Sequence, residues 1–367
     1  MSESQHFSAE DHLPDLDRQP IAASTVVRRH PDHRTAWIIV LLVRLAPGGL
    51  PPMRVLLDRL ESAVDRFPLM ASRLRGSWWV PAPGPGVSVV GRGEPLAQAP
   101  LQHFALAQEP PVRVVTSSEG DWLLLCAHHF AFDGLGMVTL LRLLLGGEAS
   151  TAPDYTTMSS QGRPPIDGLR RLLHPADRIA PSATLPSSDS FVAHQVQLSG
   201  PRVTARLASA CAAAAVAHNT QRGHPMRRIG LSVAVGGVGG EAATYRRVDV
   251  IPGQDVESAV AASLDDPRVP SELVRLPPGS FVLRPILQRF SDTLLVSNLG
   301  RLELPGVTSV EFYPVARGRS ATAVGAVSIS GQPTTLTLRA RDLSPVDAAA
   351  LLERIVAEVA RDNERPS

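Results

Sequence analysis

Residues 123–136 read LLLCAHHFAFDGLG, and this stretch decides how the rest of the chain is interpreted. Its first five residues are apolar, which predicts a buried β-strand, and the strand ends at the pair His128 and His129. Asp133 and Gly134 then form a turn signal, and a second apolar run follows them and predicts a buried helix. The sequence therefore predicts a strand-to-helix corner with polar chemistry at the end of a buried strand.

A histidine at such a strand end has a direct chemical use. The imidazole of His129, with an ordinary pKa of ~6.5, can accept a proton from a hydroxyl or an amine that attacks a carbonyl carbon. Gly134 permits the tight backbone of the turn. The alternative is a metal site, but the chain has only 2 cysteines, and Cys211 lies in an alanine-rich run where a thiol packs as a small apolar group. We therefore expect acid–base chemistry and no bound metal.

The spacing His-His-x-x-x-Asp-Gly resembles the signature of the condensation-domain and chloramphenicol-acetyltransferase superfamily. Members of this superfamily move an acyl group from a thioester to an amine or a hydroxyl. The resemblance implies that His129 is the catalytic histidine and that His128 packs or hydrogen-bonds beside it. It also implies that Asp133 and Gly134 support the loop, with Asp133 paired to an arginine.

A second stretch is similar to part of the same superfamily. Residues 293–301 read TLLVSNLGR, an apolar strand that is expected to end at Ser297 and Asn298. It resembles the Ser-Asn-x-Gly stretch in the second lobe of alcohol-type and phthiocerol-type acyltransferases. Both side chains can donate hydrogen bonds to a carbonyl oxygen, so they are candidates for lining a tunnel and holding an oxyanion. The alternative is a plain structural turn. The Asp-Phe-Gly-Trp-Gly signature of plant acyltransferases is absent.

The resemblance also implies the architecture. The expected fold is an α/β (α+β sandwich) structure of two chloramphenicol-acetyltransferase-like lobes, each a mixed β-sheet flanked by helices. The two lobes would form a pseudo-dimer with a central tunnel. Composition places an N-terminal lobe at 1–150, a Pro/Ser-rich linker at 151–190 and a C-terminal lobe at 191–367.

The expected function is that of a free-standing condensation-type acyltransferase of secondary metabolism, with His129 as general base. Its co-substrate would be a thioester of coenzyme A or of carrier-protein phosphopantetheine, its acceptor a hydroxyl or an amine, and it would hold no bound cofactor. Two alternatives stay open. One is epimerisation, cyclisation or dehydration of a carrier-bound intermediate on the same site, and the other is a non-catalytic carrier-docking module.

Composition excludes several other classes. All 36 basic residues are arginine, so a lysine Schiff base, a pyridoxal anchor and a Walker lysine are excluded. The net charge of +1 and the lack of a basic tail give no reason to expect nucleic acid. No apolar stretch reaches membrane-spanning length, and the first 18 residues are polar, so we expect a cytoplasmic protein without membrane association. We also expect a monomer.

Strand patterns mark the remainder of the sheets, at residues 36–43, 78–80, 87–90, 112–116, 122–127, 191–198, 228–235, 244–251, 323–330 and 334–339. Helices are predicted after Pro51 and Pro52, with Leu57, Leu60, Val64 and Phe67 on one face, over 137–145, and in the alanine-rich run 208–217. A short helix is possible at 167–173 inside the linker.

Two helix starts carry capping signals. Asp255 is expected to cap a helix over 256–264. Ser344 and Asp347 form a capping box around Pro345, and the apolar face of the helix that follows is made by Leu351, Leu352, Ile355, Val356 and Val359.

Two motifs resemble nucleotide or phosphate sites but are interpreted as plain loops. Residues 237–242 fit Gly-x-Gly-x-x-Ala, but a strand rather than a helix is predicted after them, which argues against a dinucleotide site. The basic patch at 28–34 is expected to be a solvated turn rather than a phosphate contact.

Overall fold

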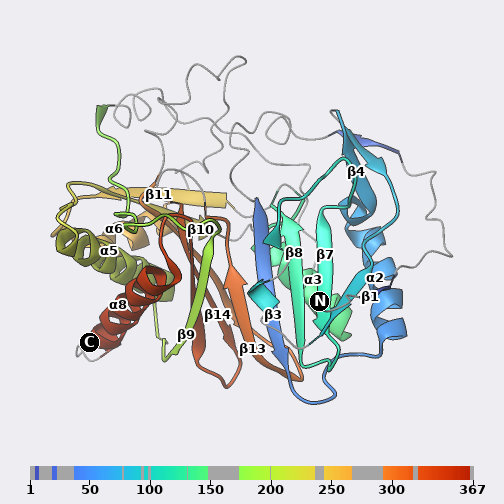
Figure 1. Cartoon of the computed structure of the whole chain (residues 1–367). Coiled ribbons are helices and arrows are strands. Elements are labelled where there is room, and N and C mark those ends of the chain that lie inside the picture. Colours follow the sequence, from blue (N-terminus) through green and yellow to red (C-terminus); the bar gives the residue numbers. More distant parts are fainter. Residues whose placement is uncertain are drawn as a thin grey trace. The chain divides into compact units, whose positions relative to one another are not determined.

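The computed structural model divides the chain into two compact units. It describes residues 5–7, 19–22, 37–76, 78–91, 95–97, 101–129, 131–147, 173–198, 200–235, 244–266, 292–316 and 321–363. Unit 1 is made of residues 1–157, 238–242 and 301–312, and unit 2 of residues 158–237, 243–300 and 313–367. Each unit contains one large sheet and its own helices (Figure 1).

Unit 1 is built on a mixed sheet with the strand order β1-β6-β7-β8-β3-β13, six strands within the described residues. The strands are β1 (Gln5–Phe7), β3 (Ile38–Leu45), β6 (Val87–Val90), β7 (Val112–Ser117), β8 (Trp122–His128) and β13 (Val307–Tyr313). β8 pairs antiparallel with both β7 and β3, whereas β6 and β7 run parallel. The predicted hairpin that delivers the histidines is therefore present, and β8 is a buried interior strand.

A smaller sheet in unit 1 has the order β2-β5-β4. Its strands are β2 (Ile21–Ala22), β4 (Ser72–Arg75) and β5 (Trp78–Pro81), and both of its pairings are antiparallel. Short 3-10 turns η1 (Pro68–Ala71) and η2 (Pro95–Ala97) complete the connections. The strand predicted at 78–80 is confirmed as β5.

Two helices of unit 1, α2 (Met53–Arg66) and α3 (Gly134–Leu145), pack on each other. The predicted apolar face of α2 is partly wrong, because Leu57 is half-exposed and Leu56 is buried in its place. Leu56, Leu60 and Ala63 lie at spacings of four and three residues, so they form the stripe that faces inward. α3 is buried on nearly all sides, as its sequence predicts.

Unit 2 is built on a second mixed sheet with the order β11-β10-β12-β14-β15-β9, again six strands among the described residues. The strands are β9 (Ser190–Val196), β10 (Ile229–Val235), β11 (Thr244–Val250), β12 (Leu294–Leu302), β14 (Thr322–Ile329) and β15 (Thr334–Ala340). β10 pairs parallel with β12, whereas β14–β15 and β15–β9 are antiparallel.

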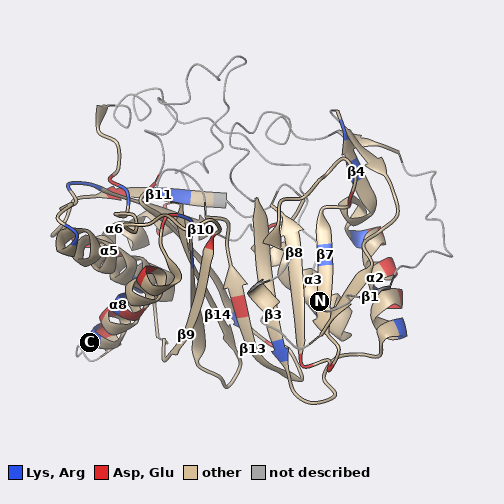
Figure 2. Cartoon of the chain, in the orientation of Figure 1, with Lys and Arg blue, Asp and Glu red and all other residues tan. Residues whose placement is uncertain are grey.

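Helices α5 (Val203–Gln221) and α8 (Pro345–Asn363) lie side by side against this sheet, and α6 (Val256–Asp265) packs on α5 (Figure 1). The alanines of α5 permit the close approach. Cys211 is fully buried among them, and this burial raises the pKa of its thiol, so it packs as the expected apolar group. In Figure 2 the charges gather on the outer faces of helices such as α2 and α8, whereas β8 carries none.

Both predicted helix caps are confirmed. The carboxylate of Asp255 accepts a hydrogen bond from Ser258 N at 3.0 Å and begins α6. Asp347 N donates to Ser344 Oγ at 3.2 Å in the first turn of α8. β11 follows β10 as an antiparallel strand, as expected in the argument against a dinucleotide site. The glycine-rich loop itself lies outside the described residues, as do the basic patch at 28–34 and residues 151–172 of the linker.

The chain passes from unit 2 to unit 1 near the end of β12. β12 belongs to the sheet of unit 2, and β13 joins the sheet of unit 1 beside β3. Residues 301–312 therefore belong to unit 1, a feature that the predicted division into lobes at 150 and 190 did not contain. Those lobe boundaries stay a prediction.

Candidate active site

The last residues of β8 are held by main-chain hydrogen bonds on both sides. His128 N donates to Pro111 O at 2.8 Å, and His129 N donates to Trp37 O at 2.7 Å. The strand itself is buried up to Ala127, and both histidines are partly exposed. A rigid, buried strand thus presents His129 at its end, where the ring can meet a ligand.

The ring of His129 is oriented by its own loop. Its Nδ1 lies 3.1 Å from the carbonyl oxygen of Phe132. A carbonyl oxygen only accepts hydrogen bonds, so Nδ1 carries the proton in this contact and Nε2 is the basic nitrogen of the neutral ring. Phe132 is itself fully buried and packs against the ring of Phe67, with centroids 5.1 Å apart. The carbonyl that fixes the tautomer is therefore held by the core.

Aromatic rings lie beside both histidines. The Trp37 indole is nearly parallel to the His129 imidazole, at 15° and 6.3 Å between centroids. The His128 ring meets Phe104 edge to face at 6.0 Å, and the Arg113 guanidinium lies 4.0 Å from the centre of that Phe104 ring. Such aromatic contacts restrict the rotation of both histidine rings.

Asp133 caps the helix that follows the motif. Its side chain is 5% exposed, and Oδ1 accepts a hydrogen bond from Gly136 N at 2.8 Å, so Asp133 is the N-cap of α3. The helix therefore begins at Gly134, three residues earlier than predicted. Gly134 is the first residue of the helix, and its expected role in supporting the strand-to-helix turn stays a prediction. The arginine partner that the resemblance implies for Asp133 stays a prediction.

Ser297 and Asn298 lie in unit 2 and within β12, not at its end. Ser297 is buried at 7% exposure. Asn298 Nδ2 donates to Thr204 Oγ1 at 3.1 Å, and Asn298 Oδ1 accepts from Gly300 N at 2.9 Å. Gly300 has φ +73°, a conformation that favours glycine, so Asn298 stabilises this local backbone conformation at the last residue of this part of unit 2.

Trp37 and the Phe132 carbonyl were missed by the sequence analysis as parts of the site. The motif places Phe132 in the loop, but no side chain signals the use of a main-chain carbonyl. Trp37 lies within the strand predicted at 36–43 and directly precedes β3, and it reaches His129 because Ile38 pairs with His128 across the ladder. That register is a property of the sheet.

A cavity of about 220 Å³ lies at the other end of the β7–β8 hairpin. Its lining includes Leu50, Thr116 and Ser117, which are near the start of β8, whereas His129 follows its end. Among the residues that the structure describes, no group of three or more His, Cys, Asp or Glu side chains is arranged to hold a metal ion. No helix in the described parts of the chain is long and apolar enough to cross a membrane.

Comparison with known proteins supports the fold. No protein-family model and no curated protein matches the sequence. Among solved structures, the chain is similar to the starter condensation domain of rhizomide synthetase RzmA, crystallised as a mutant with C8-CoA and Leu-SNAC, with a TM-score of 0.61 and 14% identity. That match covers 93% of this chain and 94% of the other.

The condensation domain of the monacolin K polyketide synthase MokA matches with a TM-score of 0.54 and 11% identity, over 91% of this chain and 94% of that one. The protein therefore has the condensation-domain fold, with a mixed sheet and helices in each of two units. The resemblance inferred from the histidine motif is confirmed at the level of fold.

Proposed function

We propose that the protein is a condensation-type acyltransferase that joins an acyl group from a thioester to a hydroxyl or amine acceptor. The observation that carries the proposal is the position and orientation of the His129 ring. It lies at the end of a buried strand, with Nδ1 on the Phe132 carbonyl and Nε2 as the basic nitrogen. The neighbours in fold support the substrate class, because one RzmA structure contains C8-CoA and Leu-SNAC.

The proposed step conserves atoms and charge. The acceptor oxygen or nitrogen attacks the thioester carbonyl carbon while Nε2 of His129 takes the acceptor's proton. The imidazolium that forms keeps its hydrogen bond from Nδ1 to Phe132 O. When the tetrahedral intermediate collapses, the carbon–sulfur bond breaks and the thiolate takes the proton from Nε2. The products are an ester or an amide and a free thiol.

We further propose that Asn298 or Ser297 donates a hydrogen bond to the oxyanion of the intermediate. An amide nitrogen carries two protons, and Thr204 accepts one from Asn298, which leaves a second donor for a substrate oxygen. Ser297 is the weaker candidate because it is 7% exposed. Loss of an oxyanion donor lowers kcat about 10²–10³-fold, so Asn298→Ala and Ser297→Ala separate the two residues.

The test is an intact-mass assay with acyl thioesters of coenzyme A and of a carrier protein against alcohol and amine acceptors. Wild type, His129→Ala and the control His194→Ala are compared, because His194 is exposed on β9 in unit 2. A joined donor and acceptor that appears with wild type and His194→Ala, but not with His129→Ala, supports the proposal.

Other results of the intact-mass assay would indicate a different function. An isomer or a loss of water in the mass spectrum indicates epimerisation, cyclisation or dehydration of the thioester instead. Binding of the carrier protein without turnover indicates a docking module. Equal turnover by His129→Ala and wild type rejects the mechanism.

A further inference from the structure

The inference concerns the two residues that face each other where β3 and β8 come together. Ile38 pairs with His128, so the next pair outward is Trp37 and His129, and His129 N donates to Trp37 O at 2.7 Å. Directly opposed residues on antiparallel strands place their side chains on the same face. The main chain of Trp37 thus fixes the backbone of His129, and its ring lies beside the imidazole.

The indole adds a contact on the face of the imidazole to the hydrogen bond at its edge. The bond from Nδ1 to Phe132 O holds one edge of the ring, but the ring can still flip by about 180° about Cβ–Cγ, which places a carbon where Nδ1 was. The indole lies nearly parallel to the ring, at 15° and 6.3 Å. Trp37 is 9% exposed, so its own position is set by the core. The indole therefore restricts the plane in which the imidazole turns.

We propose that Trp37 is a positioning residue, which holds the His129 ring so that Nε2 points at the acceptor. This inference rests on the proposed function, because it gives Trp37 a role in the proton transfer from the acceptor. Misplacement of a reacting group by about 1 Å can lower a rate about 10²-fold, so a ring that only restricts rotation can control turnover. Trp37 touches no reacting atom in this proposal and acts through His129.

The test compares Trp37→Leu and Trp37→Phe with a matched control, Trp122→Leu. Trp122 is also a buried tryptophan of unit 1, at 3% exposure, and it lies at the opposite end of β8 from His129. For Trp37→Leu we expect kcat to fall about tenfold or more while KM changes less than about twofold. Trp37→Phe, which restores a ring, is expected to recover most of kcat, and Trp122→Leu to lower only stability.

A second readout does not depend on turnover. Nitrogen-15 NMR of the His129 side chain reports which ring nitrogen carries the proton. We expect the Nδ1–H form in wild type and Trp122→Leu, and a mixture of both tautomers in Trp37→Leu.

If Trp37→Leu keeps both the wild-type kcat and a single tautomer, the positioning role is overturned while the proposed function stands. If His129→Ala retains wild-type turnover, the proposed role of His129 as general base fails instead. The NMR measurement on Trp37→Leu still tests whether Trp37 restrains the ring, and a single tautomer there rejects that restraint. A drop in kcat of the same size in Trp122→Leu as in Trp37→Leu also overturns the proposal.

Discussion

The corner after β8 in unit 1 and the corner after β15 in unit 2 are built from the same elements but carry different polar side chains. Each follows the second strand of an antiparallel hairpin, β7–β8 or β14–β15. Each of these second strands pairs on its other side with β3 or β9. Each corner then enters a helix whose first turn is capped by a side chain, Asp133 in one and Ser344 in the other.

The first residue after the strand shows the difference. In unit 1 it is His129, a partly exposed ring that contacts the Phe132 carbonyl and is flanked by an indole. In unit 2 it is Arg341, whose guanidinium lies 3.6 Å from Asp189 Oδ1 and donates to Ala316 O at 3.2 Å. Arg341 has a permanent charge and cannot take up a proton, so this position has no acid–base chemistry.

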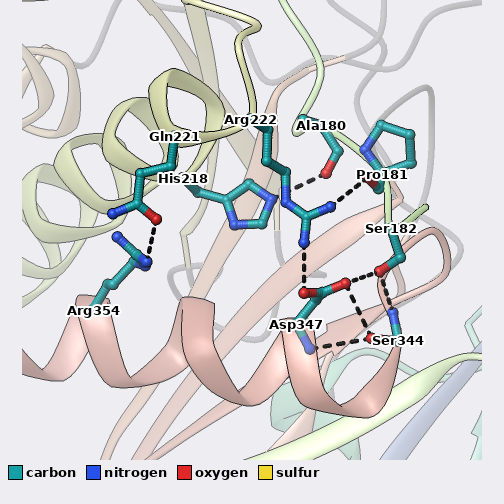
Figure 3. Close-up of polar contacts among 9 residues, drawn as sticks. All are labelled: Ala180, Pro181, Ser182, His218, Gln221, Arg222, Ser344, Asp347 and Arg354. Carbon is teal, nitrogen blue, oxygen red and sulfur yellow. Dashed lines mark hydrogen bonds and ion pairs between the residues drawn. The ribbon is translucent and has the colours of Figure 1, made fainter.

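The polar groups of the second corner bind other parts of unit 2. Figure 3 shows Asp347 as the centre of a cluster that accepts hydrogen bonds from Ser182, Ser344 and Arg222. Arg222 also donates to Pro181 O at 2.9 Å. This cluster, which we call the Asp347 cluster, fastens residues 180–182 to α5 and α8.

A histidine belongs to the Asp347 cluster as well. His218 Nε2 lies 3.0 Å from Ala180 O, so this ring is also oriented by a main-chain carbonyl. Unlike His129, it is buried, at 5% exposure. The comparison teaches that an oriented imidazole becomes a candidate base only where the surrounding fold leaves the ring accessible to a substrate.

The largest expected effect separates the two corners directly. His129→Ala should lower kcat about 10²–10⁴-fold, because a general base contributes that much, with a small change in the free energy of unfolding. Arg341→Ala should leave kcat unchanged and reduce stability. Steady-state kinetics and urea unfolding of both variants check this, and a similar loss of kcat in Arg341→Ala would contradict the division of roles.

The second prediction breaks the Asp347 cluster. Asp347→Ala removes the acceptor for three side-chain donors, and its carboxylate is partly exposed, so we expect a loss of about 2 kcal/mol in the free energy of unfolding. Glu353→Ala, an exposed carboxylate on the same helix, is the control and should change little. Urea unfolding measures both variants, and equal stability of the two would argue against a stabilising role of the Asp347 cluster.

The third prediction uses pH. Burial lowers the pKa of His218, Arg222 and Arg354 act in the same direction, and the Ala180 carbonyl and Asp347 oppose them. The unfolded chain therefore binds a proton at a higher pH than the folded chain does. We expect stability to fall as pH drops below about 6.5, with a slope of at most about 1.4 kcal/mol per pH unit from this group.

His218→Gln should remove that slope, since the amide still donates to Ala180 O but does not titrate. The exposed His194→Gln serves as the control and should keep the slope. Urea unfolding between about pH 7.5 and 5.5 measures both variants. An unchanged slope in His218→Gln would show that other groups govern the acid sensitivity.

The smallest effect tests the cap of the first corner. Asp133→Ala should cost about 1 kcal/mol of stability through the lost N-cap, with a moderate drop in kcat because the same loop holds His129. Asp133→Asn keeps an acceptor for Gly136 N and should restore most of the stability. If Asn behaves like Ala, the carboxylate charge matters more than the cap, which would favour the arginine pair that the resemblance implies.

Much of the fold was predictable because it depends on short-range signals. The apolar run before His128 predicts a buried strand, and β8 is one. Asp255 and Ser344 are typical N-cap residues and cap their helices as expected. A cap or a buried strand is specified within a few residues, so the sequence contains all the information needed to find it.

The wrong predictions concern features that depend on packing between elements distant in the sequence. Leu57 fits a helical stripe as well as Leu56 does, and only the packing of α2 decides which one is buried. Ser297 and Asn298 were expected at a strand end, but β12 continues to Leu302 in the sheet of unit 2, where it lies between β10 and β14. The hydrogen bond from Asn298 to Thr204 joins residues that are far apart in the sequence.

The sequence alone determined the strand-to-helix corner, its histidines and the resemblance that led to the fold. The tertiary structure decided which atoms orient His129, because the register of Ile38 against His128 brings Trp37 beside the ring. It also decided that β13 joins the sheet of unit 1. The physical reason is that local propensities act over a few bonds, whereas strand register and side-chain contacts depend on the packing of segments distant in the chain.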